Sequence, residues 1–292
     1  MGNIVRCITT DGAVMASAID STDIVYTAQR IHKTSPVVIA ALGRLLSASS
    51  MMGQQLKQKN ASMTLKINGG GPIGSIIAVS DSNGNCKGYV ENPVVEAEKK
   101  ANGKLDVSKA VGNNGLVYVM KDYGSGEPYI GQTPIVSGEI AEDITNYFAQ
   151  SEQIPTVCAL GVLVNKQNGM VLLSGGLLVQ LLPGADDNTI NKLEENVKKL
   201  EPVTTMLAKG YSNMDMIKKC LEGFEVEKIS EDKVKYYCNC SKERVLKAIS
   251  TLSDEEIKSL PNEKGIVEAK CHFCDKVINL TKQDLQTILS IR

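Results

Sequence analysis

The sequence contains no tryptophan, three phenylalanines and two histidines among its 292 residues. Its interior must therefore consist mainly of aliphatic side chains and methionine rather than large aromatic rings. Two histidines leave little material for the acid–base and nucleophilic chemistry that most hydrolases use. The chain also offers no recognisable Ser-His-Asp, Cys-His or paired-carboxylate arrangement, so we expect a protein that is not an enzyme.

An excess of charge of either sign is also missing. Lysine and arginine number 32 against 33 aspartates and glutamates, which gives a formal net charge of −1. From residue 224 to the end the count is 12 basic against 12 acidic residues. Proteins that bind nucleic acid or anionic membranes usually show a basic patch. We therefore expect neither partner here.

The first residues, Met1 to Cys7, lack the apolar stretch and cleavage site of a signal peptide, and Arg6 stands where a myristoylation motif needs Ser or Thr. No apolar run approaches the roughly 20 residues of a membrane span. These features predict a cytoplasmic protein whose thiols stay reduced. The isolated cysteines Cys7, Cys86, Cys158 and Cys220 are then expected to be small buried hydrophobes.

Residues 1–182 predict an α+β domain of antiparallel strands and helices. Helices are expected at 23–33 and 35–58, and a third is expected to start at Ser137 as N-cap. His32, between the first two helices, is interpreted as a structural histidine with a satisfied ring. Alternating polarity and turn residues predict strands at 4–10, 63–67, 75–79, 86–90, 105–107, 116–121, 132–136, 156–164 and 170–182.

The composition changes after Pro183-Gly184. Residues 183–230 predict charged helices with thin apolar stripes, interrupted at Pro202. Such helices are marginal alone and need a surface to dock on. We interpret the segment as a helical linker that unfolds when the surface it packs against is no longer available.

Four cysteines lie in the last quarter, as Cys238-Asn239-Cys240 and Cys271-His272-Phe273-Cys274, with 30 residues between the pairs. Two close pairs separated by one small folding unit are typical of a tetrahedral thiolate site. Sulfur ligands favour one Zn²⁺, with an iron–sulfur cluster as the alternative, and His272 remains a second candidate ligand. The sequence therefore predicts a small zinc-binding domain over 231–292, introduced by strands at 224–229 and 234–237.

Such a site is either a structural zinc knuckle or a switch. Metal-bound cysteines are thiolates, which are the species that oxidants attack. Residues two or three positions apart can also close a local disulfide, although the smaller ring is strained. Oxidation of all four ligands would eject the metal and remove much of the stability of the domain, which favours the switch.

At these residues the sequence resembles the bacterial heat shock protein 33 family of redox-regulated holdase chaperones. The resemblance covers nearly the whole chain. One departure is at Val277 and Ile278, where the family pattern has an aromatic residue. The matching motifs are Ser35-Pro36, Ala41-Leu42-Gly43-Arg44, Gly71-Pro72-Ile73-Gly74, Gly88-Tyr89, Asn92-Pro93, Lys121-Asp122, Glu127-Pro128-Tyr129, the run from Ser137 to Asp143, Tyr147-Phe148, Ser151-Glu152-Gln153, Leu182-Pro183-Gly184-Ala185, Cys238-Asn239-Cys240-Ser241 with Glu243-Arg244, and Cys271-His272-Phe273-Cys274.

The resemblance implies an ATP-independent chaperone that responds to oxidative stress. The reduced, zinc-bound form would be inactive. Oxidation would form Cys238–Cys240 and Cys271–Cys274 disulfides, release zinc and unfold the linker. The active form, as a homodimer, would bind unfolded or oxidatively damaged client proteins.

Two other classes remain open. A thiol oxidoreductase would carry an exposed Cys-x-x-Cys on a thioredoxin-like unit, whereas these pairs follow antiparallel strands. A zinc-knuckle nucleic-acid binder would need a basic, aromatic face, which the charge count does not provide.

Overall fold

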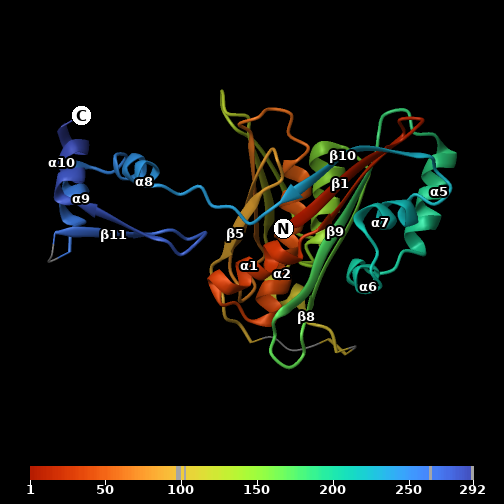
Figure 1. The fold of residues 1–292 in the computed structure, drawn as a ribbon, viewed down its shortest axis with the longest axis horizontal. Helices are drawn as coiled ribbons and strands as arrows, with labels where there is room; N and C mark the ends of the chain where they lie inside the picture. The colour runs from red at the N-terminus through yellow and green to blue at the C-terminus, as the bar shows by residue number, and fades with distance from the viewer. Residues whose placement is uncertain (97–99, 102, 263–264, 291–292) are drawn as a thin grey trace. The chain divides into compact units, whose positions relative to one another are not determined.

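The computed structural model describes residues 1–96, 100–101, 103–262 and 265–290 (Figure 1). Contacts divide the chain into two compact units, Met1–Tyr237 and Cys238–Arg292. Each unit has a hydrophobic core of its own. Antiparallel sheets combined with helices confirm the predicted α+β class.

The first sheet of the larger unit has five antiparallel strands in the order β10-β1-β2-β9-β8. Its last strand in the sequence, β10, comes from beyond the helical segment and pairs along β1, with Gly2 opposite Val234 and Thr9 opposite Val226. The strands are β1 (Gly2–Thr9), β2 (Val14–Asp20), β8 (Thr156–Val164), β9 (Val171–Leu181) and β10 (Val226–Val234).

The second sheet is also five-stranded and antiparallel, in the order β5-β4-β3-β6-β7. Buried and half-buried residues alternate along β3, β4 and β5, so one face of the sheet belongs to the core. The strands are β3 (Ser62–Asn68), β4 (Ile76–Asp81), β5 (Cys86–Val90), β6 (Leu116–Asp122) and β7 (Tyr129–Pro134).

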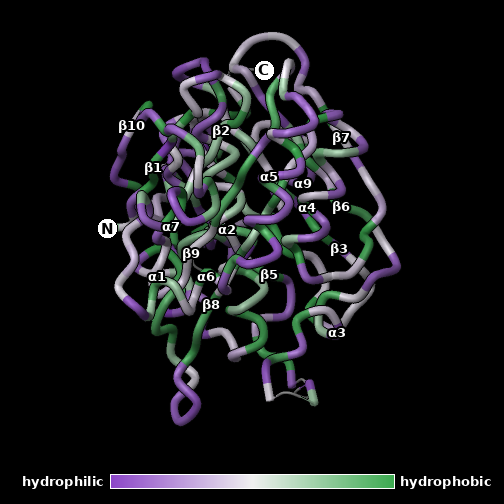
Figure 2. The backbone as a smooth tube through the Cα atoms, turned by 90° about the vertical axis from the view of Figure 1, so that its right-hand side faces the viewer, coloured by the Kyte–Doolittle hydropathy of each residue, from purple (hydrophilic) through white to green (hydrophobic). Residues whose placement is uncertain are grey.

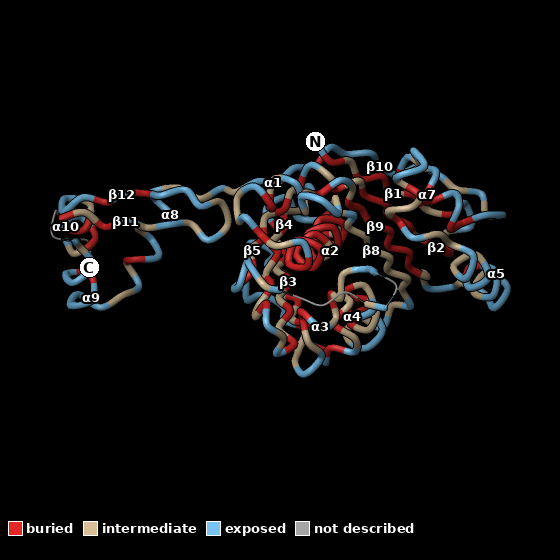
Figure 3. Tube along the Cα trace, turned by 90° about the horizontal axis from the view of Figure 1, so that it is seen from below, coloured by how far each residue is buried: buried red, intermediate tan, exposed pale blue. Residues whose placement is uncertain are grey.

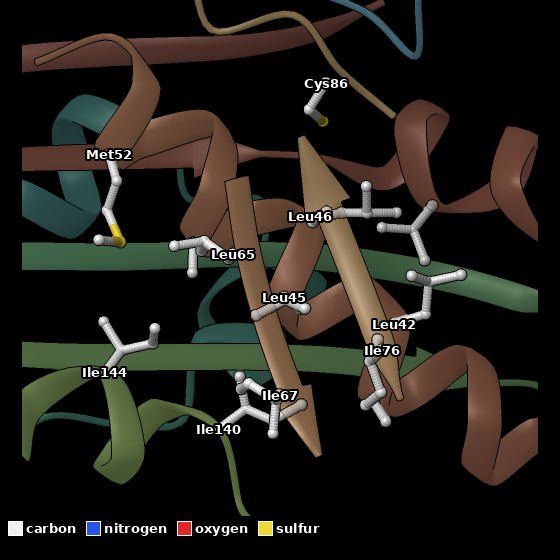
Figure 4. Packing of buried hydrophobic residues seen from close by; sticks show 14 of the residues in the cluster. Leu42, Leu45, Leu46, Met52, Leu65, Ile67, Ile76, Cys86, Ile140 and Ile144 are labelled. Atoms are coloured by element: carbon white, nitrogen blue, oxygen red, sulfur yellow. The ribbon is translucent and has the colours of Figure 1, made fainter. Parts of the chain in front are cut away.

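Helix α2 (Pro36–Gly53) lies between the two sheets and is buried along most of its length (Figure 3). Pro36 stands at its first turn, where a missing N–H costs nothing. Among the described residues, α2 is the helix that meets the length and composition of a membrane span. However, 89% of it is buried inside the unit, as in a core helix. Figure 4 shows its side chains packed against those of β3 and β4, and the labelled residues include Leu42, Leu45, Leu46, Leu65, Ile67 and Ile76.

Three short helices cover the opposite face of the first sheet from α1 (Thr22–His32) and α2 (Figure 1). They are α5 (Asp187–Lys198), α6 (Val203–Ala208) and α7 (Asn213–Cys220), and they occupy the predicted helical segment. Their caps match the sequence: Asp186 accepts from Thr189 N–H, and Ser212 forms a capping box with Asp215. Figure 2 shows that α5 is largely hydrophilic, and Leu193 is its one buried residue. The helix therefore contacts the sheet through a narrow apolar stripe.

The described residues of the smaller unit form three helices and a two-stranded sheet. Among the described residues of this unit, seven hydrophobic side chains are buried in its core, which is few for an independently stable fold. The elements are α8 (Lys242–Ile249), α9 (Asp254–Ser259), β11 (Ile266–Lys270), β12 (Val277–Thr281) and α10 (Lys282–Ser290). The hydroxyl groups of Ser241, Ser253 and Thr281 accept backbone hydrogen bonds at the starts of the three helices, as N-cap residues do.

Two local predictions are wrong. Residues 105–107 do not form a strand, because the Asp106 carboxylate caps the helix α3 (Val107–Val111) by accepting from Lys109 N–H at 3.1 Å. Ser137 is not an N-cap either, since α4 (Ala141–Tyr147) begins later and continues as a π-helix, η1 (Phe148–Glu152). The reason is the buried Asp143 carboxylate, which accepts the N–H groups of Val136, Ser137, Gly138 and Ile140.

In place of the two strands expected at 224–229 and 234–237 there is a single strand, β10, which ends at Val234 and belongs to the larger unit. Residues 235–237 follow it and pair with β5 instead. The division between the compact units therefore follows Tyr237. The domain boundaries expected from the sequence are 1–182, 183–230 and 231–292. They divide the chain by the expected response to oxidation rather than by compactness, and this division stays a proposal.

Candidate metal centre

The four cysteines of the smaller unit form one cluster. Their sulfur atoms all lie within 4.8 Å of one another. Cys238 Sγ is 3.7 Å from Cys271 Sγ, and Cys240 Sγ is 3.4 Å from Cys274 Sγ. Tetrahedral coordination with Zn–S bonds of about 2.3 Å places sulfur atoms about 3.8 Å apart. The donor set and its spacing therefore fit a thiolate-bound zinc ion.

The second pair sits in a tight turn after β11. Asp275 N–H donates to the Cys271 carbonyl at 2.9 Å, and Cys271 N–H donates to the Lys276 carbonyl at 3.0 Å. Asp275 adopts a left-handed backbone with φ of 58°, a conformation that aspartate tolerates better than most residues. This turn folds the chain back into β12, so both sulfur atoms are held near one end of the β11–β12 hairpin.

Backbone donors around Cys271 favour its thiolate form. Burial alone would raise the pKa of the Cys271 thiol, but the N–H groups of Phe273 and Cys274 and the neighbouring thiols lower it below its usual value. In the first pair, burial raises the pKa of Cys238, and burial together with the surrounding thiols raises that of Cys240 to about 12. A bound cation would supply the positive charge that holds all four as thiolates.

The first pair is set between β10 and α8. Cys240 is followed at once by Ser241, whose hydroxyl accepts from Arg244 N–H at the start of α8. Cys240 also packs against the small core of the unit. His272 is exposed and is not part of the cluster that the described residues form, so the geometry favours the all-cysteine set over a histidine ligand.

Three of the other four cysteines match the prediction that they are buried, and Cys158 is more exposed than expected. Cys7, Cys86 and Cys220 are buried, and Cys158 is half-buried. Burial raises the pKa of all four thiols, to about 12 for Cys158 and Cys220. They therefore stay protonated at neutral pH, and a protonated thiol reacts poorly with oxidants.

The helical segment docks on the first sheet through a second hydrophobic cluster. Met206, Ile217 and Cys220 are fully buried against it, and Leu193 is the one buried residue of α5. The sheet residues beneath are Val5, Cys7, Val14, Ala16, Ala18, Leu177 and Val179. Polar contacts add to the docking: Asn213 Nδ2 donates to the Asn3 carbonyl at 2.6 Å. Removing the three helices would uncover this apolar face.

A short strap, residues 235–237, joins β10 to the first cysteine pair; extended structure was predicted here, but its pairing with β5 was not. Residues 235–237 lie along β5, where Cys86 N–H donates to the Lys235 carbonyl and Tyr237 N–H donates to the Cys86 carbonyl. The Tyr236 hydroxyl donates to the Gly88 carbonyl at 2.9 Å and lies 3.2 Å from His32 Nε2. His32 thus has the partner that its structural interpretation required.

The chain is similar to known proteins over its full length. Residues 2–281 match the family model described as Hsp33 protein. A 33 kDa chaperonin from Acetivibrio thermocellus is 46% identical over 288 residues, covering 99% of this chain and 97% of the relative. One from Clostridioides difficile is 46% identical over 286 residues, covering 98% of each chain.

A solved structure agrees with these relatives. The 33 kDa chaperonin (heat shock protein 33 homolog) from Thermotoga maritima is 31% identical and has a TM-score of 0.88, covering 99% of this chain and 98% of that one. The family match, the full-length relatives and the shared fold lead to one conclusion: the chain belongs to the Hsp33 family of chaperones.

Proposed function

We propose that this chaperone is a redox-regulated, ATP-independent holdase of the bacterial cytoplasm. Reduced protein with one Zn²⁺ per chain is inactive, and oxidation of Cys238, Cys240, Cys271 and Cys274 activates it. The observation that carries the proposal is the cluster of four sulfur atoms within 4.8 Å, in a unit whose described residues bury seven hydrophobic side chains.

The metal would contribute much of the stability of that unit. Structural zinc sites couple about 10–16 kcal/mol of binding free energy to folding. A core as small as that of residues 238–292 cannot supply a comparable amount, because small domains bury little apolar surface. Loss of the metal therefore unfolds the unit.

Oxidation removes the ligands in pairs. Each disulfide forms when two thiolates give up two electrons, and one hydrogen peroxide takes them with two protons to yield two waters. Two peroxides thus convert four ligands into the Cys238–Cys240 and Cys271–Cys274 disulfides. A disulfide sulfur is a weak donor compared with a thiolate, so zinc leaves.

The helices over 183–230 are the responsive element. They hold the sheet by one buried residue in α5 and a few in α6 and α7, with exposed charges over the rest. Once they detach, the apolar face formed by β1, β2 and β9 becomes accessible. Unfolding or oxidatively damaged proteins expose apolar segments that such a face would hold. The active form is a homodimer in this account.

Alternative functions have less support. The thiols sit in a metal-like cluster rather than on a thioredoxin-like unit, and the balanced charge offers no basic surface for nucleic acid or membrane. No catalytic step is assigned to the protein.

The test is an aggregation assay with a heat-labile client and no nucleotide. Peroxide-treated protein at mildly raised temperature is expected to suppress aggregation, and the reduced zinc form is not. Equal activity of the two forms would remove the redox claim.

A further inference from the structure

Strand β10 contributes little to the core of the larger unit. Six of its nine residues are exposed and only Val234 is buried. Five carry charge, and Lys228 pairs with Glu231 within the strand at 2.8 Å. The neighbouring β1 is different, because five of its eight residues are buried. β10 is therefore held to the sheet chiefly by its backbone ladder.

That ladder is interrupted in the middle. Arg6 lies opposite Ser230 and Cys7 lies opposite Lys228, so Ile229 has no partner in the register. Ile229 is 49% exposed, although it is one of the few apolar residues of the strand. An unpaired residue of this kind is a β-bulge, and it weakens pairing locally.

Both ends of β10 are anchored to elements that the proposed activation loosens. At the start, Phe224 and Val226 pack against the cluster that the linker helices share with the sheet. At the other end, the strand continues through Tyr236 directly to Cys238, the first cysteine of the cluster. Loss of the helices and unfolding of the cysteine unit therefore remove support from both ends.

The edge beneath β10 would suit an extended peptide. β1 carries a row of backbone N–H and C=O groups along that edge, which β10 now pairs. Ile4 belongs to the first hydrophobic cluster and Val5 and Cys7 to the second, so apolar side chains flank the edge on both faces. Proteins commonly shield such an edge with a charged strand, and extended peptides bind vacated edges by adding a strand.

We propose that β10 is a displaceable cover, and that the β1 edge binds an extended, apolar segment of an unfolding client once β10 has left. This inference rests on the proposed function. β1 itself stays in place, because it is paired with β2 from Asn3 opposite Asp20 to Ile8 opposite Met15. The client strand would then continue the first sheet where β10 had been.

Hydrogen exchange measured by mass spectrometry tests the cover. In activated protein without client, the amides of β10 and the β1 amides that face it should lose protection by tenfold or more. Adding a denatured client should restore protection to β1 and not to β10. Unchanged protection of β10 on activation overturns the proposal. So does recovery of β1 protection on raising chain concentration without client, since that would assign the edge to a second copy.

A staple across the two strands tests the consequence for activity. Asn3 lies opposite Lys233, so a variant with Asn3→Cys and Lys233→Cys can close a disulfide during the same peroxide treatment, using one further peroxide. The stapled chain, verified by peptide mapping, should release zinc as the wild type does but suppress aggregation at least fivefold less. The two single variants are the matched controls and should stay active.

The outcomes separate the two claims. A stapled chain as active as the wild type overturns the role of the β1 edge and leaves the redox-regulated chaperone standing. An oxidised wild type without activity contradicts the proposed function itself.

Discussion

Cys238 and Cys271 are 33 positions apart in the sequence, yet their sulfur atoms lie 3.7 Å apart. The intervening helices α8 and α9 and the strand β11 bring them together. A contact of this kind between residues of different pairs is what a shared metal ion requires, because each pair alone offers only two ligands. The smaller unit is therefore organised around its thiols as much as around its core.

Replacing one ligand should empty the site. We expect Cys271→Ser to bind less than a tenth of the zinc of the wild type, because serine does not replace a thiolate ligand. The unit over 238–290 should then lose its amide protection while β2 and β9 keep theirs. Zinc content by a colorimetric chelator and hydrogen exchange would measure both. The matched control is Cys158→Ser, which replaces a half-buried cysteine outside the cluster. This variant should bind as much zinc as the wild type.

The pairing of the oxidised cysteines is expected to be local. Peptide mapping of peroxide-treated protein should find Cys238–Cys240 and Cys271–Cys274 disulfides, since unfolding of the unit leaves neighbours in the sequence nearest to each other. The folded structure favours a different pairing. In it, the Cys238 sulfur lies 3.7 Å from that of Cys271, and the Cys240 sulfur lies 3.4 Å from that of Cys274. Dominant Cys238–Cys271 and Cys240–Cys274 disulfides would mean that oxidation precedes unfolding.

Weakening the docked helices should lower the threshold for activation. Ile217 on α7 is fully buried, and Ile217→Ala should cost about 2–5 kcal/mol of docking free energy. We expect this variant to suppress client aggregation at peroxide doses or temperatures at which the wild type is inactive. Leu163→Ala, at a 39% exposed position on β8, is the control and should behave as the wild type. Equal thresholds for all three proteins would argue against the helices as the responsive element.

The hydrogen bonds of the Tyr236 hydroxyl should slow activation of the chaperone by peroxide. Tyr236→Phe removes its hydrogen bonds to Gly88 and His32 and should cost about 1–2 kcal/mol, because a buried carbonyl and a half-buried ring each lose a partner. The aromatic ring stays, so packing is preserved. Stopped-flow zinc release and aggregation assays should show a normal zinc site but faster activation. Activation at the wild-type rate would show that the strap does not restrain β10.

One acidic group should contribute to the pH dependence of the larger unit. Burial would raise the pKa of Glu139, but hydrogen bonds and charge from Lys100 and Arg44 lower it below its usual value. A carboxylate with a lowered folded pKa adds stability above its unfolded pKa of about 4.3, and that stability disappears as the pH falls through the folded pKa. Glu139→Gln should therefore reduce stability by about 1 kcal/mol at pH 7 and flatten its loss in acid. Denaturant titrations at pH 7 and pH 3 would measure the free energy of unfolding of both proteins. If the variant lost as much stability between the two pH values as the wild type, the prediction would be contradicted.

Periodicity predicted most of the elements because their signals are local. The Pro36 helix start and the alternation in β3 depend on a few neighbouring residues. The four clustered cysteines were also evident, since their spacing alone suggests a metal site.

What the sequence did not reveal depends on distant partners. The Asp143 carboxylate shifts the start of α4 by binding the loop before it, and nothing at Ser137 signals this. β10 joined the larger unit because β1, more than 200 residues earlier, offers it an edge. His32 did indicate that another segment packs beside it, because a half-buried imidazole ring needs a hydrogen-bond partner. Tyr236 is that partner.

The central claim is that loss of zinc and gain of chaperone activity are one event. The most direct measurement follows zinc release with a colorimetric chelator and client aggregation by light scattering in the same peroxide-treated sample. We expect one zinc per chain to be released, with activity rising in parallel and both reversed by reductant and added zinc. Full suppression of aggregation while zinc remains bound would contradict the account.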